Sequence, residues 1–163
     1  MTVKKNKKSN LITTGTVAKN RKASFNYFIE ERMEAGLVLT GSEVKSLRQG
    51  LANISESYAA EEDGEIFLVN AHIQEYGAGG HFNHIAGRKR KLLLKKKEQA
   101  KLLGAIKRKG YTLIPLSLYF NSRGIAKVEL GLAVGKELHD KRDTEKERDW
   151  NRDKQRIMRS HNN

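Results

Sequence analysis

The 163-residue sequence contains no cysteine. It therefore has no disulfide, no thiolate nucleophile and no cysteine-based zinc site, which fits a reducing compartment. It also lacks any apolar run near the roughly 18 to 20 residues that a transmembrane helix needs, and its basic first residues lack the apolar core of a signal peptide. We therefore expect a cytoplasmic protein without a membrane segment, built as one ordinary domain plus tails.

Motifs of cofactor, metal and catalytic sites are also missing. The glycine-rich residues 77–80 lack the Gly-Lys-Ser/Thr ending of a phosphate-binding loop and the spacing of a dinucleotide fingerprint. His81 and His84 have His-x-x-His spacing, but no third ligand beyond Glu75 is near in the sequence. No Ser, His and Asp set has the context of a nucleophile. We expect no metal, no cofactor and no catalytic residue.

Positive charge is abundant and unevenly distributed. The formal net charge is +13, and seven of the ten residues 88–97 are Lys or Arg. Residues 23–87, in contrast, carry ten acidic side chains against three basic ones. Such a basic run must lie on the surface or against an acidic partner, because burying an unpaired charge costs several kcal/mol. A phosphate backbone binds a dense cationic strip well, so nucleic acid is the first hypothesis; a solvated helix face is the alternative.

Hydrophobic periodicity and turn residues predict short strands and two helices. A strand is expected from Lys22 to Gly36, and the spacing predicts a helix over 43–50 with Ser42 as its N-cap. A second helix is expected within the basic run, near residues 96–107. Hairpin turns are expected at 62–64 and 121–124, and Pro115 favours an edge or bulge position. This pattern predicts a mainly β protein with a small closed antiparallel β-barrel of oligonucleotide-binding type and short flanking helices.

The ends of the chain have a different character. Residues 1–10 are basic and aperiodic and predict a disordered arm, which leaves residues 11–135 for the barrel. Residues 136–163 are mostly charged, but Thr144 and Glu147 match a capping box, and Trp150, Ile157 and Met158 fall on one helical face. We interpret this tail as disordered when free and helical against a partner; a helix docked on its own barrel is the alternative.

Several segments match a known family in order and spacing. They are Asn20, residues 27–39, Gly41-x-Glu-Val-Lys-Ser-Leu-Arg48, Asn53, Ser57-Tyr58, Asn83-His84, Arg88-x-Arg-Lys-Leu-Leu-Leu94, Pro115-Leu116, Gly135-Lys136 and Asp140-Lys-Arg142. In these segments the chain resembles the SsrA-binding protein (small protein B) family of bacteria. The resemblance covers nearly the whole chain, with Ile85-Ala86 standing where many relatives have a proline before the basic run.

The resemblance implies an RNA-binding adaptor rather than an enzyme. Members of that family bind the tRNA-like domain of transfer-messenger RNA, promote its aminoacylation and its delivery to stalled ribosomes, and support trans-translation, in which the nascent chain is tagged for degradation. It implies a monomer in a 1:1 complex with the RNA and contact with the ribosome. The RNA-facing positions that it implies are Asn20, Arg21, Lys22, Tyr27, Glu34, Tyr58, Leu93 and Lys127, with backbone contacts from Arg88, Arg90 and Lys91.

In the tail, the resemblance implies that one set of residues occupies the decoding centre and that a helix follows the empty mRNA channel. The ribosome-binding positions are then Gly135, Lys136, His139, Asp140, Lys141, Arg142, Trp150, Ile157 and Met158. Two other classes stay open. One is an RNA-processing enzyme that uses Glu30, Glu31 or residues 61–63 with a metal ion, and the other is a general ribosomal or nucleoid protein with little preference for one RNA.

Overall fold

The computed structural model describes residues 10–108, 110–136 and 138–161, without the side chains of 138–140. The expected arm 1–10 therefore lies outside the described residues except for its last position. In chain order the elements are β1 (Gly15–Lys19), α1 (Ala23–Asn26), β2 (Tyr27–Leu37), α2 (Gly41–Arg48), β3 (Ala52–Asn53), β4 (Tyr58–Glu62), β5 (Glu65–Val69), β6 (His72–Ile73), η1 (Gly80–Phe82, a 3-10 turn), β7 (Arg90–Leu93), α3 (Lys96–Ile106), β8 (Tyr111–Phe120), β9 (Ala126–Gly135) and α4 (Leu138–His161).

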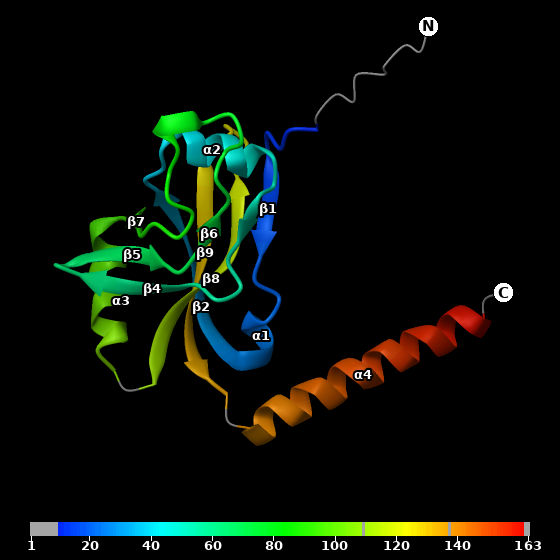
Figure 1. The fold of residues 1–163 in the computed structure, drawn as a ribbon. Helices are drawn as coiled ribbons and strands as arrows, with labels where there is room; N and C mark the ends of the chain where they lie inside the picture. Colours follow the sequence, from blue (N-terminus) through cyan, green and yellow to red (C-terminus); the bar gives the residue numbers. More distant parts are fainter. Residues whose placement is uncertain (1–9, 109, 137, 162–163) are drawn as a thin grey trace, which may run out of the picture.

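The main sheet closes on itself (Figure 1). Its strands pair in the order β8-β4-β5-β7-β2-β9, and β9 pairs again with β8, so six strands form a ring among the described residues. Every one of these pairings is antiparallel. β1 pairs with β8 outside the ring, and β3 and β6 form a separate two-stranded sheet. The predicted mainly β architecture with short flanking helices is confirmed.

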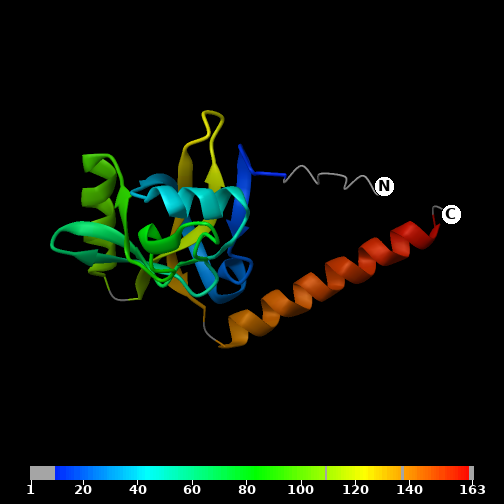
Figure 2. The same ribbon diagram turned by 45° about the horizontal axis from the view of Figure 1, so that its top comes forward.

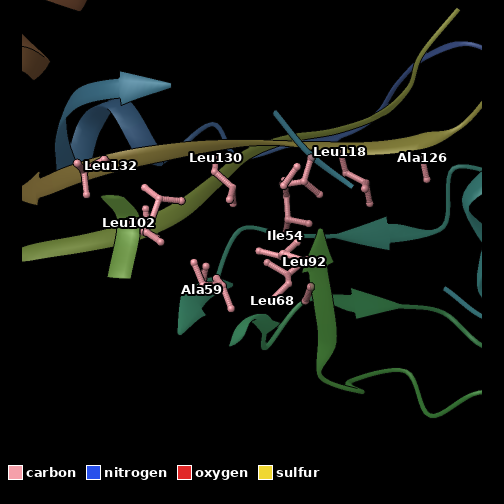
Figure 3. Packing of buried hydrophobic residues seen from close by; sticks show 14 of the residues in the cluster. Ile54, Ala59, Leu68, Leu92, Leu102, Leu118, Ala126, Leu130 and Leu132 are labelled. Atoms are coloured by element: carbon pink, nitrogen blue, oxygen red, sulfur yellow. The ribbon is translucent and has the colours of Figure 1, made fainter. Parts of the chain in front are cut away.

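Alternating apolar side chains fill the inside of the ring. Leu118 and Leu130 come from β8 and β9, and Leu68 and Leu92 come from the opposite wall; all four are buried (Figure 3). Each fully buried leucine contributes about 1.5–3 kcal/mol relative to an exposed one. Leu102 of α3 joins the same cluster. The interior is therefore closed by packing, and functional groups must lie on the outer surface or at the ends of the ring.

Both predicted hairpins are present. Asp63 and Gly64 have φ angles of 51° and 77°, the left-handed pair that a tight turn between β4 and β5 requires. The turn between β8 and β9 is fixed by Asn121, whose Oδ1 accepts from the backbone amides of Arg123 and Ile125 at 3.0 and 2.9 Å. The register of β8 shifts between Pro115 and Ser117, as expected for a bulge.

Two local expectations were wrong. The strand expected from Lys22 begins only at Tyr27, because residues 23–26 form the short helix α1, and it continues through Gly36 to Leu37. The N-cap of α2 is Thr40, not Ser42. Thr40 Oγ1 accepts from the Glu43 amide at 3.4 Å and the Glu43 carboxylate accepts from the Thr40 amide at 3.0 Å, so a reciprocal capping box begins this helix.

The tail forms one helix, α4, that extends away from the ring (Figure 2). It begins at Leu138, so Thr144 lies inside it and the expected capping box at Thr144 was wrong. Every residue from 145 to 161 is exposed, although Arg148 of this helix donates a hydrogen bond to Ser24 of α1. Coupling of tail folding to a partner stays a prediction.

Candidate nucleic-acid interface

Four of the expected RNA-facing residues line one hollow beside α1. Asn20 follows β1, Lys22 immediately precedes α1, and the first residues of β2 and β4 are Tyr27 and Tyr58. Together with their neighbours they enclose about 540 Å³. The ring of Tyr58 is exposed and that of Tyr27 is half-buried. The fold thus places two aromatic rings, one amide and one ammonium group around a single hollow, which we call the tyrosine hollow.

The amide of Asn20 has one hydrogen-bonding atom without a partner. Asn20 is only 8 % exposed, and its Nδ2 donates to the Pro115 carbonyl at 3.0 Å. Its Oδ1 is buried and accepts no hydrogen bond within the described residues, and Asn20 lines both the tyrosine hollow and a neighbouring hollow that includes Arg148. An unsatisfied buried acceptor costs roughly 1–3 kcal/mol, so a ligand that donates to this oxygen would recover that free energy. Donors of this kind are the ring NH and amino groups of nucleobases.

Three other expected residues meet at a second hollow. Glu34 and Lys127, from the paired strands β2 and β9, lie with Leu93 of β7 around about 500 Å³ beside α3. Lys95, Lys97 and Lys101 line it as well. The sequence pattern placed these lysines in the basic run but indicated no specific site for them. The helical spacing of the run was the signal that could have placed them on one face. We call this region the lysine hollow.

The Glu34 carboxylate is held by two neighbours. The Tyr119 hydroxyl donates to Glu34 Oε2, and Lys127 Nζ lies 3.8 Å from Glu34 Oε1. Burial raises the pKa of Tyr119, and the hydrogen bond to Glu34 raises it further, so the phenol keeps its proton and stays a donor. This arrangement fixes the direction of a carboxylate that faces a cationic hollow. An oriented carboxylate of this kind accepts from base amino groups and disfavours a misplaced phosphate.

Arg90 was expected to contact an RNA backbone, and the structure contradicts this. Its side chain is 0 % exposed, and its Nε donates to Glu43 Oε2, itself fully buried. Its Nη1 and Nη2 donate to the carbonyls of Ala71 at 2.9 Å and Ala86 at 3.0 Å. For Arg90 of the basic run, the acidic partner is therefore the buried Glu43 of the same chain. Arg90 connects β7, α2 and the loop before β7, and it is not part of an RNA surface.

Arg88 and Lys91 differ from Arg90 in exposure. Arg88 Nη2 donates to Glu43 Oε1 at 2.5 Å and to the Val38 carbonyl at 3.1 Å, with the side chain about one third exposed. Lys91 pairs with Glu65 at 2.8 Å, and both side chains are 41 % exposed. A pair this exposed contributes at most about 1 kcal/mol, so Lys91 can exchange Glu65 for a phosphate.

Burial alone raises the pKa of the Glu43 carboxyl, but hydrogen bonds from the Thr40 amide, Arg90 and Arg88 outweigh it and leave the pKa below its ordinary value. A folded-state pKa below the unfolded one means that Glu43 stabilises the fold at neutral pH. That contribution is lost as the pH falls through the lowered pKa.

Arg21 points to a different region from Lys22. With Lys19 and Arg148 it lines a shallow hollow on the other side of α1. Arg148 belongs to α4, and its Nη2 donates to Ser24 Oγ at 2.7 Å. Arg21 therefore shares a hollow with the tail helix and is not among the residues that line the tyrosine hollow.

The first tail residues are tied to α1. The amide of Lys136 donates to the Asn26 carbonyl at 2.9 Å, and its Nζ donates to the Ser24 carbonyl at 2.8 Å and to Thr144 Oγ1 at 2.9 Å. Gly135 ends β9, and Lys141 and Arg142 lie in the first turns of α4. The remaining expected tail residues are His139 and Asp140, whose side chains are not described, and Trp150, Ile157 and Met158, which are exposed on α4.

No cluster of three metal-ligating side chains occurs within the described part of the chain. His84 is buried, and its ring nitrogens lie 2.9 Å from Ser42 Oγ and from the Ile73 carbonyl oxygen, so both are already in hydrogen bonds. Over those same residues no helix is long and apolar enough to span a membrane.

Comparison with known proteins gives consistent results. The family model of SmpB protein matches residues 17–160. The SsrA-binding protein of Chelativorans sp. (strain BNC1) is 61% identical over 144 residues, which cover 88% of this chain and 93% of that protein. The SsrA-binding protein of Caulobacter vibrioides is 59% identical over 143 residues, which cover 88% of this chain and 94% of that protein.

A solved structure of the same kind also matches. It is described as tmRNA-SmpB on a journey to the center of the bacterial ribosome, and the matching chain is 49% identical with a TM-score of 0.63. The match covers 77% of this chain and 86% of that one. The match to the family model and the high identity to these relatives over most of the chain show that it belongs to the SmpB family of SsrA-binding proteins.

Proposed function

We propose that this protein is a non-catalytic adaptor that binds the tRNA-like domain of transfer-messenger RNA, promotes its aminoacylation and brings it to stalled ribosomes. The observation that carries the proposal is the tyrosine hollow, which Tyr27 and Tyr58 line together with Asn20, whose buried Oδ1 has no partner within the described residues. Family membership and the likeness to a chain described with tmRNA and the ribosome support it.

The two hollows contact different parts of the RNA in this proposal. In the tyrosine hollow, Tyr27 and Tyr58 stack on unpaired bases and Asn20 accepts from a base edge. In the lysine hollow, Glu34 accepts from a base donor while the surrounding lysines neutralise phosphates. Tyr27 and Glu34 belong to the same strand, and seven residues of strand span roughly 23 Å. One rigid strand thus holds both contacts at a fixed separation, which suits a folded RNA better than a flexible single strand.

The tail acts on the ribosome in this proposal. Gly135, Lys136 and residues 139–142 take the place of a codon–anticodon pair in the decoding centre, and α4 follows the empty mRNA channel. The exposed side chains of Trp150, Ile157 and Met158 are then available to rRNA. Because α1 also contributes Ala23 and Asn26 to the tyrosine hollow, the contacts of Lys136 and Arg148 with Ser24 connect the RNA site to the start of the tail. Such a protein works as a monomer in a 1:1 RNA complex, in the cytoplasm.

Single substitutions in the hollows are expected to separate recognition from charge attraction. Tyr27→Ala and Glu34→Ala should each weaken binding of the tRNA-like domain by ~1–3 kcal/mol, because a stacking surface or a base-edge acceptor is lost. Binding of a random RNA of equal length should change little. Dissociation constants for both RNAs at one fixed salt concentration give the comparison.

Tyr27→Phe is the matched control, since it keeps the ring and removes only the hydroxyl, and it should bind like the wild type. Equal losses on the cognate and the random RNA would show that Tyr27 and Glu34 only support the fold. A loss of turnover on adding a chelator, with RNA binding intact, would favour a metal-dependent enzyme instead.

A further inference from the structure

The helix α2 lies at the opposite end of the ring from the start of α4 (Figure 1), and a further hollow lies beside it. It is formed between the first turn of α2 and the loop that contains η1, and it encloses about 340 Å³. Lys45, Tyr76 and Phe82 line it. Phe82 is 95 % exposed, the highest exposure among the large apolar side chains in the described part of the barrel. A phenylalanine ring left in water does not gain the free energy of burial. An apolar ring exposed in this way marks a surface that binds a partner.

The loop is held in place by one amide side chain. Asn83 Oδ1 accepts from the Tyr76 amide at 3.1 Å, and Asn83 Nδ2 donates to the Tyr76 carbonyl at 2.7 Å, so Asn83 closes residues 76–83 into a ring. Gly79 fits inside this ring only because it has no side chain: a Cβ there would lie 2.8 Å from Asn83 Cγ. Phe82 is therefore presented from a fixed backbone, so the loop loses little backbone entropy when a partner binds.

The loop is also fixed to the barrel. His84 bridges Ser42 of α2 and the Ile73 carbonyl of β6, with 2.9 Å to each. Lys45, on the next turn of α2, places its Nζ 5.4 Å from the centroid of the Tyr76 ring. The backbone positions that carry the two aromatic rings and the ammonium group are thus fixed relative to one another, and no acidic residue of the described chain lines the hollow.

We propose that this hollow is a third RNA site, separate from the two assigned to the tRNA-like domain, and that it takes one unpaired nucleotide. The base stacks on Phe82, the ring of Tyr76 forms a second wall, and the phosphate meets Lys45. Stacking on exposed rings combined with a nearby cation is the common mode of binding unpaired nucleotides, and it tolerates any base. The absence of acidic side chains from the lining favours an anionic ligand over a basic peptide.

An apolar protein segment is the competing occupant. Ile85 is 75 % exposed on the same loop, and a protein partner would use it together with Phe82. A stacked base, in contrast, requires the flat ring and gains little from an aliphatic side chain. The two occupants therefore differ in what Ile85 contributes, and Ile85→Ala serves as the matched control for Phe82→Ala.

The test uses the full-length protein saturated with the tRNA-like domain, which occupies the first two hollows. A six-nucleotide adenosine oligomer with one central 2-aminopurine is titrated in, and its fluorescence reports stacking. We expect saturable quenching with the wild type, an apparent dissociation constant about ten-fold higher for Phe82→Ala, and wild-type behaviour for Phe82→Trp and Ile85→Ala. Lys45→Ala should reduce the slope of log affinity against log salt by about 0.7, the value for one phosphate contact on a single strand.

Three results would overturn the proposal: no saturable quenching with the wild type, an unchanged constant for Phe82→Ala, or an equal loss for Ile85→Ala, which would show that the oligomer does not depend specifically on the Phe82 ring. The titration is repeated without the tRNA-like domain, and binding of that domain is measured by itself. If the proposed adaptor function is wrong, the protein will fail to bind the tRNA-like domain in that separate measurement, and this result does not depend on oligomer binding.

Discussion

Ending the chain after Gly135 is expected to leave binding of the tRNA-like domain near the wild-type value and to abolish tagging of stalled nascent chains. Both RNA hollows are formed by residues before this point. The deleted helix is exposed from residue 145 to 161, so its removal should not open the core of the barrel. The measurements are RNA affinity and the yield of tagged peptide from ribosomes stalled on a message without a stop codon.

A point substitution should reproduce much of that defect without deleting a charge. Ile157→Pro places proline inside α4, where it removes a helical hydrogen bond and costs about 3 kcal/mol. Ile157→Ala is the control, because it shortens the apolar face but keeps the helix. Tagging should fall most for proline. Full tagging by the truncated chain or by Ile157→Pro would mean that the tail is a solvated appendage.

Arg90→Ala is expected to lower the free energy of unfolding by about 3–5 kcal/mol, because it leaves Glu43 buried beside a single remaining arginine. Chemical denaturation measures this loss. As the pH is lowered through the depressed pKa of Glu43, the difference between wild type and variant should shrink, since the carboxylate is then neutral in both.

Lys97→Ala is the matched control for charge, because it removes a cation that lines the lysine hollow and is exposed. It should leave stability unchanged and reduce the slope of log affinity against log salt by about 0.7–0.9. The Arg90→Ala protein that remains folded should keep the full slope, which we expect near −3 to −5 for about four to six neutralised phosphates. A lower slope with unchanged stability for Arg90→Ala would place this guanidinium on the RNA after all.

Local signals in the sequence predicted the parts of the fold that depend on near neighbours. Asp63-Gly64 and residues 121–124 indicated their turns because φ angles and side-chain-to-backbone bonds are set within four residues. The mainly β fold followed from these signals together.

Contacts between distant segments were beyond sequence reasoning. Nothing near Arg90 in the chain identifies Glu43, which is 47 residues away, as its partner, so a basic run was assigned to the surface as a whole. Lys95, Lys97 and Lys101 share the lysine hollow with Glu34 of β2 and Lys127 of β9, which come from distant parts of the chain. Asn20 and Tyr58 meet because β1 and β4 both pair with β8. Pairing partners, rather than residue types, decided which side chains share a site.

The RNA that co-purifies with the full-length protein from cells tests the central claim most directly. Sequencing of that RNA, normalised to total cellular RNA, should show strong enrichment of transfer-messenger RNA with the wild type and loss of this enrichment with a Tyr27→Ala and Glu34→Ala double variant that remains folded. Co-purified RNA that mirrors total cellular RNA, or an enrichment that the double variant retains, would contradict the account.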